Sequence, residues 1–439
     1  MNHTLLRNAL LVLAAAMVVR VLAVFLLQPH LGTYVIDAYD VMGKNLLAGH
    51  GFSYQAGQTV PTVTRAPFYP LWWAGLLEVF GRNFYLLRMA EGFVDAVTAG
   101  LVVMLSFSLS RPFLSAGPPQ VGNQTDTANI ANATAIATVA GAIYAVQPFS
   151  VYYAVKMGTE TWFTFWLVLA LLFFVSWCRR PTYARGALLG SVFGILMLNK
   201  STAAGLLIVL LALGLALLHR RGRLPYVSAL VCVAVAALVI TPWLARDYRV
   251  TGGHFVAIQT LTSWNFWADF DFSARGYTHS IDSHYGRGGG HPYALSAKSD
   301  VAQEERLRSQ ALHWMAAHPA AMLKKMGNNV LEFWYLTEGM RSVQITAAAS
   351  IIELLAAFAG AWLAWRARNR QLIVLTMLVV TYFDIIYSPL KSVFHYSLVV
   401  VPLLCVLQAY LFVWLARHLR GSRSGTPNGV TEAVKRMSG

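Results

Sequence analysis

Long apolar runs separated by short polar segments dominate the hydrophobic pattern of the chain. A helix needs about 20 apolar residues to cross a hydrocarbon core about 30 Å thick, and helices satisfy their own backbone groups there. The runs predict about ten spanning helices. Asn199 and Lys200 interrupt the run at 184–202, which is the least regular. The predicted spans are 8–28, 87–110, 130–147, 161–178, 184–199, 201–218, 226–244, 345–365, 371–388 and 395–416.

Composition supports an all-α polytopic membrane protein with a single transmembrane domain, residues 1–439. Hydrophobic residues make up 57% of the chain and charged residues only 12%, whereas soluble proteins are about one quarter charged. The first run is long and has no small-residue cleavage site before Pro29, so it is interpreted as a retained span. Cys178, Cys232 and Cys405 lie in or beside apolar runs without metal-ligand spacing, which is typical of packing residues.

The formal net charge of +15 could indicate a nucleic-acid partner, but its distribution indicates membrane topology. The arginines gather in short segments between the predicted spans, as cytoplasmic loops do under the positive-inside rule. No nucleic-acid partner is therefore expected. The clusters are Arg179, Arg180 and Arg185, then Arg220, Arg221 and Arg223, then Arg366, Arg368 and Arg370, then Arg417, Arg420 and Arg423.

With a cytoplasmic N-terminus, two long loops face the opposite side of the membrane, residues 29–86 and residues 245–344. The functional surface is expected there. The first loop contains an amphipathic stretch at 69–81, whose Trp72 and Trp73 suit a helix lying at the level of the lipid headgroups.

The second loop contains a Gly-rich stretch at 275–293, which predicts a mobile flap, and a helical pattern at 304–334. Histidines in the flap could hold a metal in principle, but their spacing matches no known ligand pattern. The chain shows no internal repeat, so the signature of many transporters is missing. The flap's candidate ligands are His279, His284, His291 and Asp282.

Three carboxylates on the outward side are candidates for chemistry. Asp37 and Asp40 follow the first span, where they could be hydrated loop residues, a general base or metal ligands. Glu160 stands at the outer mouth of the fourth span, where a carboxylate is costly unless it faces a polar cavity. The alternative for Glu160 is an ion pair with Lys156 one helical turn earlier.

Several cations lie on the same side. Arg65 and Lys200 suit a phosphate ligand, although Lys200 could instead snorkel towards the headgroups. Arg88, Glu91 and Asp95 fall on one helix face, which favours a buried structural ion network. Arg88 is nevertheless close enough to the outer surface to serve a site. Lys391 and His395 lie just before or at the start of the last span. A single histidine in such a place is weak evidence for a functional site.

Five motifs occur in a characteristic order after the first span and its aspartate. They are NLLAGHGFSY (45–54), TRAPFYPLWW (64–73), YYAVKMGTETWFTF (152–165), TPWLARDYRVTGGHFVAI (241–258) and HYSLVVVPLL (395–404). This order resembles that of the C-type (GT-C) membrane glycosyltransferases, in particular the bacterial branch of protein-mannosyltransferase-like and aminoarabinose-transferase-like enzymes. The resemblance covers most of the chain, and the combination is more specific than any single motif.

The resemblance implies a GT-C fold of about ten or more spans with amphipathic helices in the first outer loop. It also implies inverting transfer of a sugar from a polyprenyl-phosphate donor to a hydroxyl of a lipid, glycan or protein. Asp37 then matches the catalytic aspartate, Glu160 the second acidic residue, and Arg65 the holder of the lipid phosphate. Ala38 and Thr64 stand where relatives often have acids, so no cofactor is expected to be required and a divalent metal is a minority interpretation.

The resulting hypothesis places a bacterial inner-membrane enzyme with its active site on the periplasmic side. A transporter or flippase of lipid-linked sugars is the alternative, against which the missing repeats and the long outer loops argue. A non-catalytic scaffold would leave Asp37 and Glu160 unexplained. Candidate phosphate ligands are Arg65, Lys200, Arg88 and His395, and candidate contacts to donor or acceptor are Asp40, Lys44, Tyr69 and Tyr153.

Overall fold

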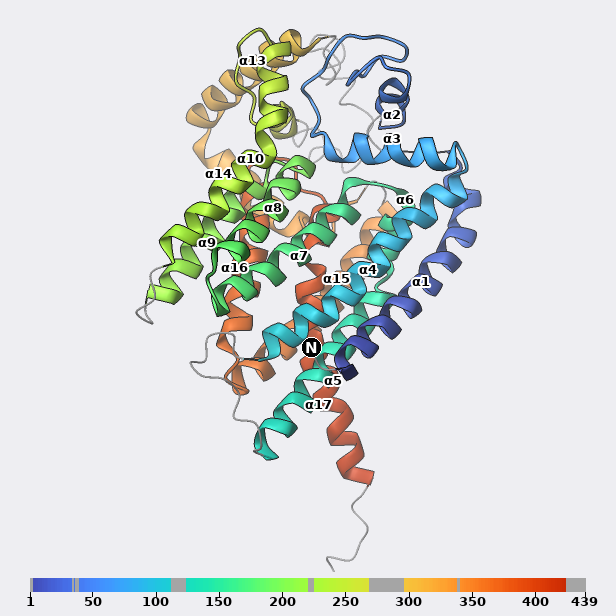
Figure 1. Ribbon diagram of the computed structural model, residues 1–439, viewed down its shortest axis with the longest axis vertical. Helices are drawn as coiled ribbons and strands as arrows, with labels where there is room; N and C mark the ends of the chain where they lie inside the picture. The colour runs from blue at the N-terminus through green and yellow to red at the C-terminus, as the bar shows by residue number, and fades with distance from the viewer. Residues whose placement is uncertain are drawn as a thin grey trace, which may run out of the picture.

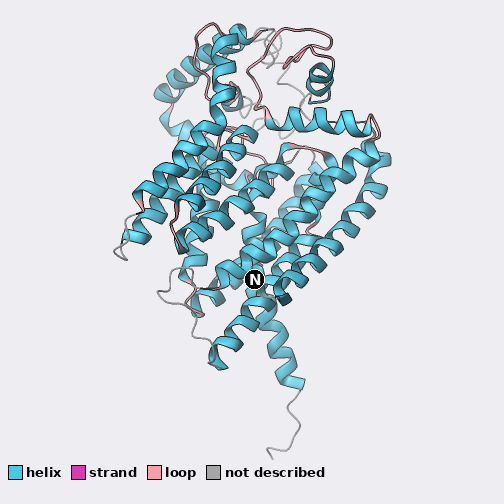
Figure 2. Ribbon diagram, in the orientation of Figure 1, coloured by secondary structure: helices cyan, strands magenta, loops and turns pink. Residues whose placement is uncertain are grey.

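A computed structural model describes residues 3–33, 35, 39–111, 124–219, 225–267, 296–337 and 340–423, and its regular elements are helices (Figure 1, Figure 2). Within these ranges eight helical segments are long and apolar enough to cross a membrane. This confirms an all-α polytopic membrane protein. The segments are α1 (His3–Leu31), α4 (Phe84–Ser110), α5 (Gln124–Val146), α7 (Thr159–Arg179), α10 (Tyr226–Val250), α15 (Met340–Arg366), α16 (Arg370–Tyr387), and η2 (Phe394–Val400) continued by α17 (Val401–Arg423).

Two further apolar helices, α8 (Tyr183–Asn199) and α9 (Ala203–His219), have 17 residues each. At 1.5 Å per residue each is about 25 Å long, somewhat less than a hydrocarbon core. Each of the ten predicted runs falls on one of the ten apolar segments just described. The polar interruption after Asn199 is a break between α8 and α9.

Small residues let α8 and α10 pack backbone to backbone. Gly186, Gly190 and Gly194 recur every fourth residue on α8, and a Cβ on Gly190 would lie 2.2 Å from the carbonyl oxygen of Cys232 on α10. Such spacing of small residues is typical of close helix pairs in membranes. Side chains at these positions would push the two helices apart.

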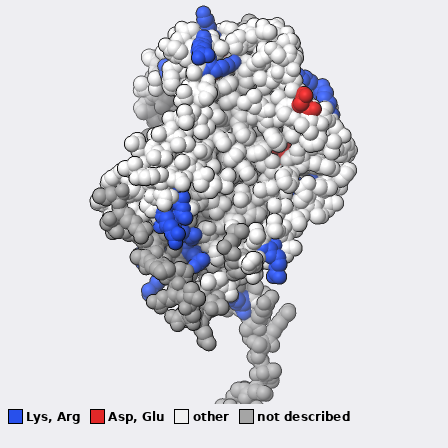
Figure 3. All heavy atoms as spheres, viewed as in Figure 1, with Lys and Arg blue, Asp and Glu red and all other residues white. Residues whose placement is uncertain are grey.

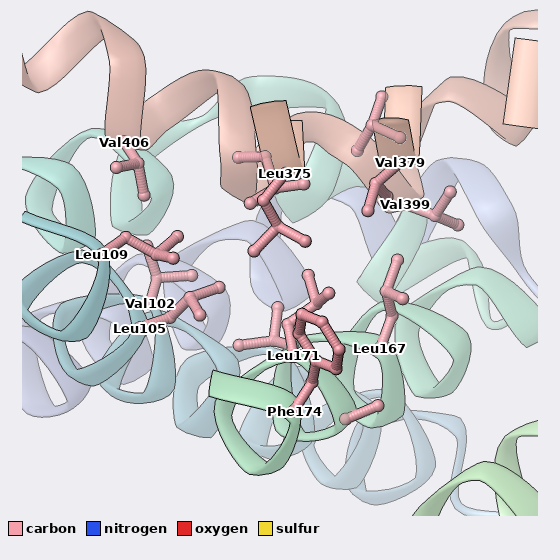
Figure 4. Packing of buried hydrophobic residues seen from close by; sticks show 14 of the residues in the cluster. Val102, Leu105, Leu109, Leu167, Leu171, Phe174, Leu375, Val379, Val399 and Val406 are labelled. Atoms are coloured by element: carbon pink, nitrogen blue, oxygen red, sulfur yellow. The ribbon is translucent and has the colours of Figure 1, made fainter. Parts of the chain in front are cut away.

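Aliphatic side chains from α4, α7, α16 and α17 fill the core (Figure 4). Leu105, Leu171, Leu375 and Val406 are each at most 1% exposed. This packed interior fixes the helices whose outer ends carry several of the candidate site residues.

A buried ion pair ties α1, α4 and α5 together. The Arg20 guanidinium donates to Asp95 Oδ2 over 2.7 and 2.9 Å, and the Tyr144 hydroxyl donates to Asp95 Oδ1 over 2.6 Å. Arg20 is fully buried, so its charge requires the carboxylate. Asp95 therefore belongs to a buried ion network, as its helix face predicted, with its cation coming from the first span.

Helix ends beside two of the arginine clusters meet at one end of the bundle. Arg179 Nη2 donates to the Ser108 carbonyl over 2.9 Å, and Asn369 Nδ2 donates to the Leu109 carbonyl over 2.7 Å. Figure 3 shows basic side chains grouped on the lower half of the bundle, with others near the top. The cluster at 220–223 lies outside the described residues.

Topology can be tested with reporter tags. Tags after Arg180, Arg221 or Arg368 are expected to report the cytoplasm, and a tag at Gly289 is expected to report the outside, because positive loops stay inside. Membrane-impermeant labelling of intact cells against lysed cells gives the measurement. Reversed accessibility would contradict the placement of the site as well as the topology.

The opposite end of the bundle carries the short helices (Figure 1). They are α2 (Tyr39–Leu47), α3 (Phe68–Phe80), α6 (Pro148–Lys156), α13 (Ala297–Ala317) and α14 (Pro319–Glu332). The helical pattern at 304–334 is divided between α13 and α14. Pro319 begins α14 because proline lacks the backbone N–H that a continuous helix would need.

We call this end of the bundle, opposite the helix ends beside the arginine clusters, the outer end. Helix α3 lies across it, at the residues where the sequence predicts an amphipathic helix (Figure 1). Its two tryptophans pack against the protein. Trp73 is fully buried, and Trp72 is partly buried and donates to Glu91 Oε1 over 2.8 Å. The exposed apolar residues of α3 are Leu71 and Val79.

Candidate functional site

A buried ion pair occupies the outer ends of α7 and α8. Glu160, in the first turn of α7, accepts a hydrogen bond from Lys200 Nζ over 2.7 Å. His395 Nε2, in η2, lies 4.0 Å from the same carboxylate oxygen, and the Thr159 hydroxyl donates to it over 3.2 Å. The side chains of Glu160 and Lys200 are 8% and 14% exposed. The fold thus brings together three predicted site residues that are far apart in sequence.

Aromatic rings enclose the Lys200 ammonium. Its Nζ lies 5.7 Å from the ring centroid of Phe163 and 5.1 Å from that of Tyr396. Cation–π contacts of this kind stabilise an ammonium that has left water. Lys200 is therefore held in a fixed protein environment, which is unlike a lysine that snorkels freely towards lipid.

Positive charge gathers around His395. Lys156, Lys200 and Lys391 all lie close enough to act on its imidazole electrostatically, together with the carboxylate of Glu160. Lys156 Nζ lies 5.4 Å from the ring centroid of Tyr153, whose ring is 6.0 Å from that of His395. These charges make the cluster net cationic, and such a cluster attracts an anionic group.

Arg65 reaches the same end of the molecule from the first outer loop. Its Nε donates to the Tyr54 hydroxyl over 2.7 Å, and its guanidinium carbon lies 5.8 Å from the ring centroid of Tyr39. Tyr39 packs edge to face on Tyr69 at 4.8 Å. Arg65 is partly buried, and these contacts hold it against aromatic residues of the first outer loop and α2.

Aromatic contacts join the Arg65 region to the Glu160 region. Phe68 and Trp72 of α3 both contact Trp162 of α7, with ring centroids 5.1 and 4.8 Å apart. Trp162 follows Glu160 by two residues, and the charge of Glu160 acts on Tyr69. Helix α3 is thereby a cover over the outer end of α7, with Arg65 directly before it.

Burial raises the pKa of Tyr69 well above its ordinary value, and the carboxylate of Glu91 raises it further. Tyr69 is 1% exposed and Glu91 is fully buried. Tyr69 therefore stays a neutral phenol at any physiological pH. It packs against Tyr39 and lies close to Glu91, so it belongs to the group of aromatic side chains around Arg65.

Arg88 has a different environment from the other candidate phosphate ligands. It is fully buried, and its guanidinium donates to the Gln28 side chain, the Val155 carbonyl and the Gly32 carbonyl, the last over 3.2 Å. These bonds fasten the outer end of α1 to α4 and α6. This placement suits a structural role for Arg88. Its partners named here are neutral groups, whereas the helix face predicted an ion network with Glu91 and Asp95, and Asp95 pairs with Arg20 instead.

Asp40 lies at the surface with two cations. Lys44 Nζ donates to it over 2.6 Å, and Arg82 Nη2 lies 3.5 Å away. The side chains of Lys44 and Arg82 are 44% and 53% exposed, so these are solvated pairs of small energetic weight. Asp40 and Lys44 are thus engaged with one another at the rim of the first loop.

Two predicted sites fall outside the described residues. Asp37 is one, and the flap at 275–293 with its histidines is the other. Within the part of the chain that the structure describes, no group of three or more His, Cys, Asp or Glu side chains could hold a metal ion.

Sequence reasoning missed the residues that organise the outer loops. Arg246 Nη1 donates to the Thr62 carbonyl over 2.7 Å and to Asp247 Oδ1 over 2.8 Å, and Asp247 is fully buried. An adjacent Arg and Asp directly after an apolar run were the available signal.

Comparison with protein-family models gives no match, and no curated protein matches the chain. The described structure defines a polytopic, all-helical membrane protein with a cationic, aromatic-lined cluster at one end of its bundle. We refer to the residues Arg65, Glu160, Lys200 and His395 as the outer cluster.

Proposed function

We propose that the chain is an inverting glycosyltransferase that moves a sugar from a polyprenyl-phosphate donor to a hydroxyl acceptor at the outer face of the inner membrane. One observation carries the proposal. The fold gathers the outer cluster from four separate segments at the end of the bundle opposite the arginine-rich end. A phosphate at a membrane surface is the anion that such cations suit.

The donor chemistry fits this location. A polyprenyl chain anchors the sugar phosphate in the lipid, so the protein needs no nucleotide-binding domain to hold it. Arg65 would bind the phosphate oxygens through its planar guanidinium, and the ammonium of Lys200 would add a point charge. Both charges stabilise the phosphate as negative charge develops on it.

The proposed reaction is a direct displacement. The acceptor oxygen attacks the anomeric carbon, the bond from that carbon to the phosphate oxygen breaks, and polyprenyl phosphate leaves. Asp37 takes the proton of the acceptor hydroxyl as a general base. Glu160 holds Lys200 in place in this scheme, and a single displacement predicts inversion at the anomeric carbon.

Arg65 allows the donor-binding step to be tested. Arg65→Ala is expected to weaken binding of polyprenyl phosphate about 10- to 100-fold, because one or two charge-assisted hydrogen bonds are lost. Arg65→Lys should weaken it less, since the charge remains and the bidentate fork is lost. Titration of purified protein with polyprenyl phosphate gives the measurement.

Arg82→Ala is the matched control, because Arg82 is an exposed arginine of the same outer region, with a 3.5 Å contact to Asp40 and a 5.7 Å cation–π contact with Phe84. It should bind polyprenyl phosphate as the wild type does. Equal affinity in the wild type and Arg65→Ala would rule out Arg65 as the phosphate ligand.

A further inference from the structure

The segment directly before Arg65 is held by a carboxylate from the second outer loop. Asp300 Oδ2, in the first turn of α13, accepts hydrogen bonds from the Thr62 hydroxyl over 2.7 Å and from the Val63 backbone N–H over 3.0 Å. The Thr62 and Thr64 hydroxyls are 2.9 Å apart, which extends the network one residue closer to Arg65. We call residues 62–64 the strap.

These contacts are shielded from water. Asp300, Thr62 and Thr64 are each 2% exposed, and Val63 is fully buried. Hydrogen bonds to an ionised acceptor in such surroundings are strong, and their loss leaves buried donors without partners. The strap is therefore fixed by Asp300 and cannot exchange these bonds for water.

Two more residues of the later sequence hold the strap backbone. Arg246 Nη1 donates to the Thr62 carbonyl over 2.7 Å, and the Thr260 N–H donates to the Val63 carbonyl over 3.1 Å. The partners of the strap thus come from the end of α10, the segment after it, and α13. Helix α3 begins at Phe68 on the other side of Arg65.

We infer that Asp300 is a positioning residue, which sets Arg65 in place for the donor phosphate by fixing the strap from α13. The functional half of this inference rests on the proposed role of Arg65. The structural half rests on the hydrogen bonds of the strap, which fix the backbone directly before Arg65.

The carboxylate geometry offers a way to separate position from charge. Both hydrogen bonds use Oδ2, while the buried Oδ1 has no hydrogen-bond partner in the described part of the chain. An asparagine could therefore keep both bonds through its carbonyl oxygen. Burial raises the pKa of Asp300 to about 6, while the bonds from Thr62 and Val63 and the charge of Arg246 lower it.

The matched control lies one turn along the same helix. Glu304 accepts hydrogen bonds from the Ser263 hydroxyl over 2.7 Å and from the Ser263 N–H over 3.0 Å. These bonds do not involve the strap. Glu304→Ala removes a comparable carboxylate from α13. It should loosen the Ser263 contact and leave Arg65 in place.

The test compares Asp300→Ala, Asp300→Asn and Glu304→Ala in the full chain. The first readout is hydrogen exchange of the strap together with modification of Arg65 by phenylglyoxal, followed by peptide mass spectrometry. The second readout is the Kd for polyprenyl phosphate. Asp300→Ala should increase strap exchange and Arg65 modification and raise the Kd about tenfold, whereas Asp300→Asn and Glu304→Ala should stay within about twofold of the wild type.

Strap exchange and Arg65 modification equal to the wild type in Asp300→Ala would overturn the inference, as would an equal rise of the Kd in Glu304→Ala. If Asp300→Ala does not fold, Thr62→Val replaces it, because it removes only the hydroxyl that Asp300 binds. A wild-type protein that binds no polyprenyl phosphate would refute the proposed function, while the first readout would still decide whether Asp300 holds Arg65.

Discussion

Lys200→Met is expected to destabilise the protein by about 3–5 kcal/mol, because it leaves the buried Glu160 carboxylate without its cation. Glu160→Gln should also destabilise it, since Lys200 then loses its counter-ion. The double substitution Glu160→Gln with Lys200→Met should recover most of the loss, because two neutral side chains of similar volume replace the buried pair. Equilibrium unfolding in mixed micelles measures all four proteins.

Measuring transfer activity in the same four proteins separates the effect of the pair on stability from its effect on function. The double variant should remain folded and yet transfer poorly, since the charge proposed to stabilise the phosphate is gone. Lys44→Met is the control, because the Lys44–Asp40 pair has a similar 2.6 Å distance at the surface, and its loss should cost less than about 1 kcal/mol. Equal losses of unfolding free energy in Lys200→Met and Lys44→Met would contradict the claim that burial makes the Glu160–Lys200 pair important for stability.

Asp37→Asn is expected to reduce transfer about 10²–10⁴-fold, the usual effect of losing a positioned general base. The substitution keeps the size of the side chain and removes its ability to take a proton. Folding and donor binding should stay close to those of the wild type. Release of polyprenyl phosphate measures turnover, with monodispersity and thermal unfolding as controls for folding.

Asp40→Asn is the comparison for this base. It should be much milder, because Asp40 already pairs with Lys44 and Arg82 at the surface. If Asp40→Asn lost transfer and Asp37→Asn kept it, Asp40 would be the base. Normal turnover in both variants would leave the proposed mechanism without a base in the first loop.

Hydropathy predicted the helices well because it is a local property of the sequence. Each of the ten predicted runs coincides with an apolar helical segment, although α8 and α9 are shorter than the others. The break at Pro319 follows from the same local rules, because proline lacks the backbone N–H of a continuous helix, whereas periodicity alone predicts a single helix over 304–334.

Partners of buried charges were harder to predict because they depend on the assembled fold. The sequence offers Lys156, one helical turn earlier, as the partner of Glu160, whereas the structure pairs Glu160 with Lys200, 40 positions later, at 2.7 Å. The Arg20–Asp95 pair spans 75 positions and joins two runs that hydropathy treats as uniform. The packing of Trp72 and Trp73 was hard to predict for the same reason. The amphipathic pattern of α3 identifies an apolar face but does not show which other helix packs against it.

The hydrogen bonds between the outer loops were the hardest feature to predict from the sequence. Asp300 and Val63 are 237 positions apart, and neither residue type is unusual in a polar loop. The strap matters because it directly precedes Arg65. Only the folded structure shows that α13 holds the strap.

The most direct test of the central claim is a transfer assay with purified protein in lipid nanodiscs, a polyprenyl-phosphate sugar and a panel of hydroxyl acceptors. The account predicts equal amounts of free polyprenyl phosphate and new glycoside, with the anomeric configuration inverted, and little of either in Asp37→Asn. The same donor in sealed vesicles tests the alternative. Donor that crosses the bilayer intact, without release of polyprenyl phosphate, would contradict the account and identify a flippase.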